Sequence, residues 1–169
     1  MCDLAIRQAQ PEDAKALLAC LSQIGSESEN LSFGPEGPGF TVAQETEYLQ
    51  GLQQAEKSVL LCAWKGDTLV GTASLNALSR RMAHRAELSV SVIRSAWGQG
   101  VGSALMARLL VFARKHGVEI INLEVRSDNL RAIRLYEKYG FRRIGTSPAF
   151  FKIGGQYVDA EMMYLDLRR

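Results

Sequence analysis

The sequence predicts a mixed α/β fold built on a central sheet. Residues 86–93 and 120–126 alternate apolar and polar side chains, as strands with one buried face do, and a segment of helical period follows each. This succession favours two parallel strands joined by a crossover helix at residues 100–116. Paired apolar runs at residues 58–77 and 141–167 predict two antiparallel hairpins beside them.

The first half of the chain predicts two helices. Pro11-Glu12-Asp13 follows a predicted strand at residues 4–9 and begins a helix to about Ile24, since proline suits a first turn and acids face the positive end of the helix dipole. Thr41 and Gln44 have the spacing of a capping box, which predicts a second helix to about Ala55. Its buried side is expected to carry Val42, Tyr48, Leu49 and Leu52.

Residues 25–39, between these helices, are predicted to form a long loop. The segment contains three acids, no basic residue and many glycines and prolines, the acids being Glu27, Glu29 and Glu36. Loops of this length are usually functional or disordered. If the loop lines a site, its acids favour a cationic ligand.

Composition points to one soluble domain, residues 1–169. The chain has 169 residues, of which 47% are hydrophobic, and a net charge of +2, too small to argue for a nucleic-acid partner. Three widely spaced cysteines outside any metal-ligand pattern favour reduced thiols, a cytoplasmic location and no metal; they are Cys2, Cys20 and Cys62. The absence of an 18-residue apolar run and of a signal-type N-terminus predicts neither a membrane span nor export. Eight arginines are interpreted as solvated or phosphate-facing: Arg80, Arg81, Arg85, Arg126, Arg131, Arg134, Arg142 and Arg143.

The segment between the strand at 86–93 and the crossover helix predicts a phosphate site. Its glycines let the backbone approach a ligand, and N–H groups at a helix start point outward with the positive end of the dipole behind them. Neither the Walker pattern nor the dinucleotide pattern is present. A glycine turn without a ligand is the alternative, so a second motif is needed. The expected binding groups belong to Gly98, Gln99, Gly100, Val101, Gly102 and Ser103.

That second motif lies at residues 123–141, Leu-Glu-Val-Arg-Ser-Asp-Asn-Leu-Arg-Ala-Ile-Arg-Leu-Tyr-Glu-Lys-Tyr-Gly-Phe. With the strand at 87–92 and the glycine segment, it resembles the GNAT superfamily of acyl-CoA-dependent N-acyltransferases, closely over residues 84–145. The resemblance implies the GNAT fold, a mostly antiparallel sheet of six to seven strands with splayed parallel strands 4 and 5 and about four flanking helices. One departure is Trp97, which stands where the family's phosphate loop usually begins with Arg or Gln.

The resemblance also implies how the co-substrate acetyl-CoA binds. The two parallel strands are expected to separate at a bulge in the first, so that the pantetheine arm lies beside the backbone of Val90 and Val92 as an added strand. The diphosphate is expected on residues 98–103. Asn129, a helix N-cap by residue type, is expected to contact the cofactor as well.

Acyl transfer from a thioester to an amine requires a neutral amine and a stabilised thiolate. Glu87 is the candidate base, because it begins the strand that flanks the thioester and lies on its polar face. Glu124 on the neighbouring strand is the rival, and a water chain that relays the proton is a third route. Tyr136 stands where the family carries the tyrosine that meets the departing sulfur. Since a phenol is a weaker acid than a thiol, we expect a hydrogen bond rather than full proton transfer; simple packing is the alternative role.

These expectations describe an N-acetyltransferase that moves an acetyl group from acetyl-CoA to a primary amine by direct attack in a ternary complex. The acceptor is expected to be a small cationic molecule, an amino acid or a peptide, with the hairpin at 141–167 closing one side of its pocket. A protein N-terminal acetyltransferase and a non-catalytic acyl-CoA sensor are the alternatives. A homodimer is compatible with the sequence, which does not determine the oligomeric state, the acceptor or the acyl-chain preference.

Overall fold

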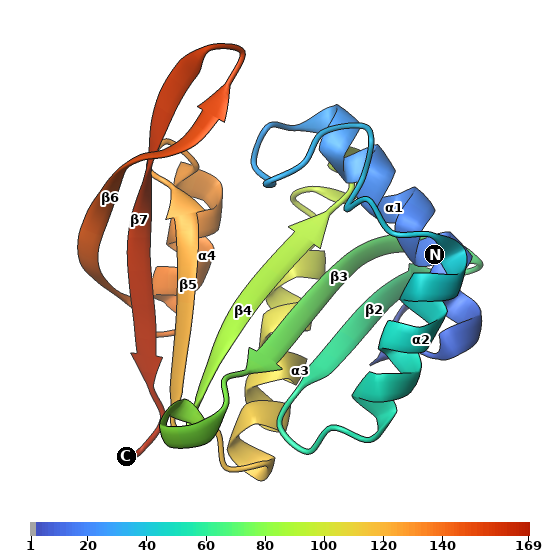
Figure 1. Cartoon of the computed structure of the whole chain (residues 1–169), viewed down its shortest axis with the longest axis horizontal. Helices are drawn as coiled ribbons and strands as arrows, with labels where there is room; N and C mark the ends of the chain where they lie inside the picture. Colours follow the sequence, from blue (N-terminus) through green and yellow to red (C-terminus); the bar gives the residue numbers. More distant parts are fainter. Residues whose placement is uncertain (1–2) are drawn as a thin grey trace.

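The computed structural model describes residues 3–169 and contains a seven-stranded sheet (Figure 1). The strand order is β1-β2-β3-β4-β5-β7-β6, and β4 and β5 are parallel while their neighbours pair antiparallel. The predicted mixed, mostly antiparallel sheet is therefore confirmed. The strands are β1 (Leu4–Gln8), β2 (Val59–Lys65), β3 (Thr68–Ala77), β4 (Arg85–Val92), β5 (Ile120–Arg126), β6 (Arg142–Ile153) and β7 (Gln156–Asp166).

In the described part of the chain, four α-helices cover the sheet, two on each face (Figure 1). α3 and α4 lie on one face, and α1 and α2 lie on the other. Short 3-10 turns occur at Pro11–Asp13, Arg80–Met82 and Arg94–Ala96. The helices are α1 (Ala14–Glu27), α2 (Val42–Gln53), α3 (Val101–Lys115) and α4 (Leu130–Lys138).

The two parallel strands form a fork that is closed at one end. β4 and β5 pair only from Arg85 opposite Ile120 to Glu87 opposite Asn122, and beyond these residues they diverge. Arg85 donates from Nε and Nη2 to the Asn122 side-chain oxygen at 3.1 and 2.7 Å, which ties the closed end. The prediction of a bulge in β4 is wrong, because β4 keeps an unbroken register with β3. Each arm follows its outer neighbour instead, β4 following β3 and β5 following β7.

The core lies between α3 and the centre of the sheet. Apolar residues at helical spacing on α3 are completely covered, including Leu105, Met106 and Leu109, and they pack with Leu75 and Ile121 of the strands. Burial of such side chains stabilises the fold by about 1.5–3 kcal/mol each. This packing fixes the start of α3 against the end of β4, where the glycine segment lies.

Two expectations about α1 and α2 need correction. α1 continues past Ile24 to Glu27 and includes Gly25, whose lack of a Cβ leaves room for the Gly34 carbonyl of the following loop. On α2 the capping box is confirmed, but Val42 and Tyr48 are 48% and 45% exposed. Leu49 and Leu52 are buried as predicted.

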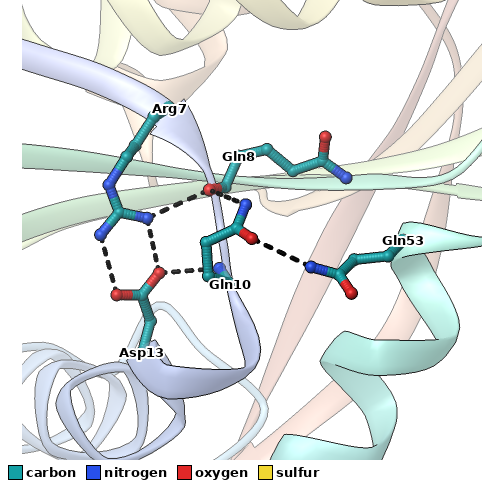
Figure 2. A network of polar contacts seen from close by, with 5 residues as sticks. All are labelled: Arg7, Gln8, Gln10, Asp13 and Gln53. Atoms are coloured by element: carbon teal, nitrogen blue, oxygen red, sulfur yellow. Dashed lines mark hydrogen bonds and ion pairs between the residues drawn. The ribbon is translucent and has the colours of Figure 1, made fainter.

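A polar network ties β1 to the beginning of α1 and the end of α2 (Figure 2). Arg7 donates two hydrogen bonds to the Asp13 carboxylate at 2.6 and 2.8 Å, and the Gln10 N–H donates to the same carboxylate. The Gln10 side chain accepts from Gln53 Nε2 at 2.9 Å. The Arg7 hydrogen bonds hold the pKa of Asp13 below its usual value.

Cys20 and Cys62 are free and buried, and burial raises the pKa of each thiol to about 12. Cys2 lies outside the described residues. Within residues 3–169, no helix combines the length and the apolar character needed to cross a membrane.

Candidate active site

A cavity of about 600 Å³ opens between the arms of the fork. Its walls come from β4, the glycine segment, the end of β5 and the first turns of α4, and residues of the loop after α1 cover it. Among the described residues that line it, Glu124 is the one acid and Arg131 the one base. A groove of this size and composition suits a long ligand with polar amide groups.

The glycine segment begins α3 at the mouth of this cavity. Gly98 and Gly100 have φ angles of +71° and +78°, a region that other residues rarely adopt, and Gly100 is the N-cap of α3. A Cβ at Gly102 would lie 3.3 Å from Leu135 of α4, so this glycine permits close helix packing. Gly98, Gly100, Val101, Gly102 and Ser103 line the cavity. Gln99 does not, since its side chain binds Lys65 and the Ser95 carbonyl.

The register of β3 with β4 decides which backbone groups face the fork. Ile93 N–H donates to Val70 O at 2.9 Å and Leu78 N–H donates to Arg85 O at 2.9 Å. In an antiparallel ladder, residues whose backbone groups bond to the neighbouring strand alternate with residues whose backbone groups point away from it. The N–H and C=O groups of Leu88, Val90 and Val92 therefore point away from β3. They point into the gap where β5 has diverged. The Val92 carbonyl is already bound by the Trp97 indole N–H at 2.8 Å.

The candidate catalytic residues are not all brought together. Glu124 of β5 and Tyr136 of α4 line the cavity, whereas Glu87 lies exposed at the last paired position of the fork and does not. Tyr136 is 6% exposed, and burial alone raises the pKa of its phenol to about 12. Asn129 lines the cavity and its side chain caps α4 by accepting the Ala132 N–H at 3.3 Å, so the predicted cap is confirmed.

The end of α1 and the loop that follows it, residues 28–41, are tied to both arms of the fork by arginines. Beyond β4, the Arg94 N–H donates to the Glu27 carboxylate at 2.6 Å and its guanidinium binds the Glu27 carbonyl. On β5, Arg126 donates to the Glu29 carbonyl at 2.9 Å, and its other nitrogens bind Asp128 at 2.9 and 2.8 Å. We call residues 27–36, so held, the strap.

The strap's acids are therefore used within the protein. Glu27 and Glu29 bind the two arginines, and Glu36 accepts the Gly34 N–H at 2.8 Å. The hydrogen bond from the Arg94 backbone lowers the pKa of Glu27. Glu27 and Glu29 lie beside arginines, which weakens their attraction for a cationic acceptor, whereas the Gly34 N–H leaves the negative charge of the exposed Glu36 in place. Attraction of a cationic acceptor by these acids stays a prediction.

A second cavity of about 970 Å³ lies beside the first, under the strap. The tip of the β6–β7 hairpin forms its far wall through Lys152, Ile153 and Gly154. A bulge at residues 148–150 shifts the register of this hairpin, and Asp159 accepts the Ala149 N–H at 2.8 Å there. Bulges change the direction of strands near functional sites. Here the β6–β7 hairpin changes direction before its tip (Figure 1).

The family model described as Acetyltransferase (GNAT) family matches residues 27–141, the segment that builds the fork, the glycine segment and α4. The chain belongs to the GNAT acetyltransferase family. A solved GNAT acetyltransferase from Streptococcus pneumoniae superposes with a TM-score of 0.95 at 26% identity, covering 98% of this chain and 100% of the other.

Relatives with named activities include two bacterial N-acetyltransferases. An N-alpha-acetyltransferase RimI of Mycobacterium tuberculosis is 36% identical over 62% of this chain and 63% of its own length. An L-amino acid N-acetyltransferase AaaT of Escherichia coli is 30% identical over 96% of this chain and 98% of its own. Another mycobacterial relative is longer, and the chain spans 26% of it.

Membership of the GNAT family identifies acetyl-CoA as the co-substrate, and the residues present fit it. The φ angles of Gly98 and Gly100 turn the backbone into the start of α3, and the free N–H groups of a helix start suit a phosphate. The outward backbone groups of Leu88 and Val90 suit an arm that carries two amides. When bound, acetyl-CoA supplies the acyl group as a thioester.

Sequence reasoning missed several residues of this GNAT site. Ser28, Asn30 and Leu31 of the strap line the main cavity, yet the sequence marks them only as loop. Trp97 keeps a structural role, since its indole binds Val92 and its ring lies beside Arg94 and Arg131. The sequence did offer one signal. The glycine segment contains no basic residue, so a phosphate bound there would need a Lys or Arg from another part of the chain.

Proposed function

We propose that this chain transfers the acetyl group of acetyl-CoA to the α-amine of a free L-amino acid or a closely related small amine, by direct attack in a ternary complex. The observation that carries the proposal is the fork cavity, which joins outward backbone groups of β4 to Glu124 and Tyr136 on its walls. The similarity to the E. coli L-amino acid N-acetyltransferase over nearly the full length of both chains supports the acceptor class.

The chemistry of the acceptor supports an α-amine. Freeing an α-amine of pKa near 8 from its proton at pH 7 costs about 1.4 kcal/mol, whereas a lysine-type amine of pKa near 10.4 costs about 4.6 kcal/mol. An exposed carboxylate can act as base more easily for the α-amine than for the lysine-type amine, because less free energy is needed to remove the proton. The strap and the hairpin tip, which stand on either side of the second cavity, favour a small acceptor over a folded protein surface.

Within this proposal, Glu124 takes the role of base in preference to Glu87. Glu124 lines the cavity, and the exposed Glu87 lies at the closed end of the fork outside it. Glu124 accepts the amine proton directly or through a water chain, and the Tyr136 hydroxyl donates a hydrogen bond to the departing sulfur. Val90 and Val92 orient the cofactor arm through their backbone groups, Gly98–Ser103 and Asn129 hold its phosphate end, and Gln99 contributes its N–H alone.

The test is thiol release from acetyl-CoA with a panel of free L-amino acids, polyamines and short peptides. The proposal expects release with one or more free amino acids at a kcat/KM at least tenfold above that for any peptide. A higher kcat/KM for peptides than for free amino acids would instead support a protein N-terminal acetyltransferase, which the similarity to RimI favours. Tight CoA binding without release for any acceptor would support an acyl-CoA sensor.

A further inference from the structure

The glycine segment has no positive side chain for the phosphates of its ligand. Residues 97–103 read Trp-Gly-Gln-Gly-Val-Gly-Ser, so the segment itself offers backbone N–H groups and the dipole of α3. The coenzyme A diphosphate carries two negative charges, and bound phosphates in proteins usually have a Lys or Arg partner as well. Such a partner has to come from another element.

Arg131 of α4 is held at the beginning of the segment. Its guanidinium lies 4.6 Å from the centre of the Trp97 ring, and Trp97 is itself fixed by the bond from its indole to Val92 O. Arg131 lines the cavity, and it takes part in none of the ion pairs among the described residues. It also lies in the first turn of α4, where the helix dipole repels a cation and no acid offsets it. An anion bound between Arg131 and the segment would relieve this repulsion.

Lys138, at the other end of α4, is held at the end of the segment. Its Nζ lies 3.1 Å from the Ser103 hydroxyl, in the first turn of α3. Tyr139 fixes the same serine, because its hydroxyl donates to the Ser103 carbonyl at 2.7 Å. Between the two cations, Leu135 packs against Gly102. α4 therefore lies along the segment with one free cation at each end of it.

We propose that Arg131 and Lys138 bind the diphosphate of coenzyme A and so supply the positive charge that the glycine segment lacks. Trp97 acts in this arrangement as the platform that orients Arg131, through cation–π contact with its guanidinium. The proposal rests on acetyl-CoA as the co-substrate and is independent of the acceptor.

The test measures the Kd of coenzyme A by calorimetry for Arg131→Ala and Lys138→Ala, with Arg134→Ala as the matched control. Arg134 lies on the same helix and carries the same charge. Unlike Arg131 it does not line the cavity, and unlike Lys138 it has no hydrogen bond to the glycine segment among the described residues. We expect each of the two variants to raise Kd by about tenfold, the loss typical of one charge-assisted contact, and the control to leave it within about twofold. Thermal unfolding without ligand shows that each variant is folded.

Two further ligands separate the phosphates. The loss in Arg131→Ala should persist with 3′-dephospho-coenzyme A, which keeps the diphosphate, and should vanish with S-acetylpantetheine, which has no phosphate. A loss that disappears with the dephospho compound would overturn the assignment to the diphosphate. So would a wild-type Kd in Arg131→Ala, or an equal loss in Arg134→Ala. Failure of the wild-type protein to bind coenzyme A at all would contradict the proposed function instead.

Discussion

Tyr136 is a buried phenol whose environment decides how it can act. Its pKa is raised to about 12 by burial, against about 8.5 for a thiol, so proton transfer from this phenol to a thiolate is uphill by about 5 kcal/mol. A hydrogen bond to the sulfur is the favourable interaction. We expect Tyr136→Phe to lower kcat about 10- to 100-fold with an unchanged KM for acetyl-CoA. The alkaline limb of the kcat–pH profile should be the same in both proteins, and its loss in the variant would identify Tyr136 as a titrating acid.

Glu87 and Glu124, one on each parallel strand of the fork, can be compared directly as candidate bases. Glu124 lines the cavity and Glu87 does not, although both are exposed and lie on the same face of the sheet. We expect Glu124→Gln to lower kcat at least about 100-fold, the range typical of general bases, and Glu87→Gln to change it less than about threefold. Steady-state kinetics with one acceptor decide between them. A larger loss in Glu87→Gln would restore the base predicted from the sequence.

Single residues were predictable where local backbone chemistry dictates them. The Asn129 cap and the glycines at Gly98 and Gly100 follow from rules that act within a few residues. Glu87 and Glu124 could not be ranked this way. Their distance from the cavity depends on where the fork closes, and the Arg85–Asn122 contact that marks this point joins residues far apart in the sequence.

The strap is the element whose role depends most on long-range contacts. Glu27 binds Arg94 beyond one arm, and Glu29 binds Arg126, whose side chain is only 11% exposed, on the other. Glu27→Ala removes the carboxylate that accepts the Arg94 N–H but keeps the backbone carbonyl that the Arg94 guanidinium binds. It therefore loosens one end of the strap, which should let the acceptor side of the fork open. We expect Glu27→Ala to raise the acceptor KM about 3- to 10-fold while the Kd of coenzyme A changes less than twofold, since contacts to a charged group contribute about 1.5–3 kcal/mol, part of which exposure to solvent removes.

Glu36→Ala is the control for the strap. It removes an acid from the same segment, but Glu36 accepts the N–H of its neighbour Gly34 and, among the described residues, has no hydrogen bond or ion pair to either arm. An equal rise in acceptor KM in this variant would show that charge, not attachment, is what matters. That result would also support the prediction that the acidic loop attracts cationic acceptors.

Elements were predicted well where their own periodicity is strong and less well where packing overrides it. α3 and the capping box of α2 appear where the pattern places them. The helix was predicted to end near Ile24, yet it runs to Glu27 and includes Gly25, which lies so close to the Gly34 carbonyl of the strap that a Cβ would overlap it. Such close approach of a distant loop leaves no signal in the local pattern.

At the scale of the whole molecule, the sheet and the parallel pair at its centre were predictable from alternation and from the family motifs. The cause of the fork was not. A bulge in β4 was expected, but β4 holds its register with β3, and β5 holds its register with β7. The fork thus arises from two continuous halves of the sheet that share only a short pairing, which is a property of the full topology.

The Arg7–Asp13 pair gives the whole fold a pH dependence. The guanidinium lowers the pKa of Asp13 in the folded state, so the pair stabilises the protein above the unfolded pKa of about 3.9, and this contribution is lost as pH falls through the folded value. Arg7 is 47% exposed, which limits the effect to roughly 1 kcal/mol. We expect Asp13→Asn to be less stable than the wild type by this amount at pH 7, with the difference shrinking below pH 4. Urea unfolding at both pH values measures it, and a double-mutant cycle with Arg7→Gln isolates the pair. A difference that stays constant with pH would contradict this account, because the contacts from Arg7 and from the Gln10 N–H both favour the ionised carboxylate.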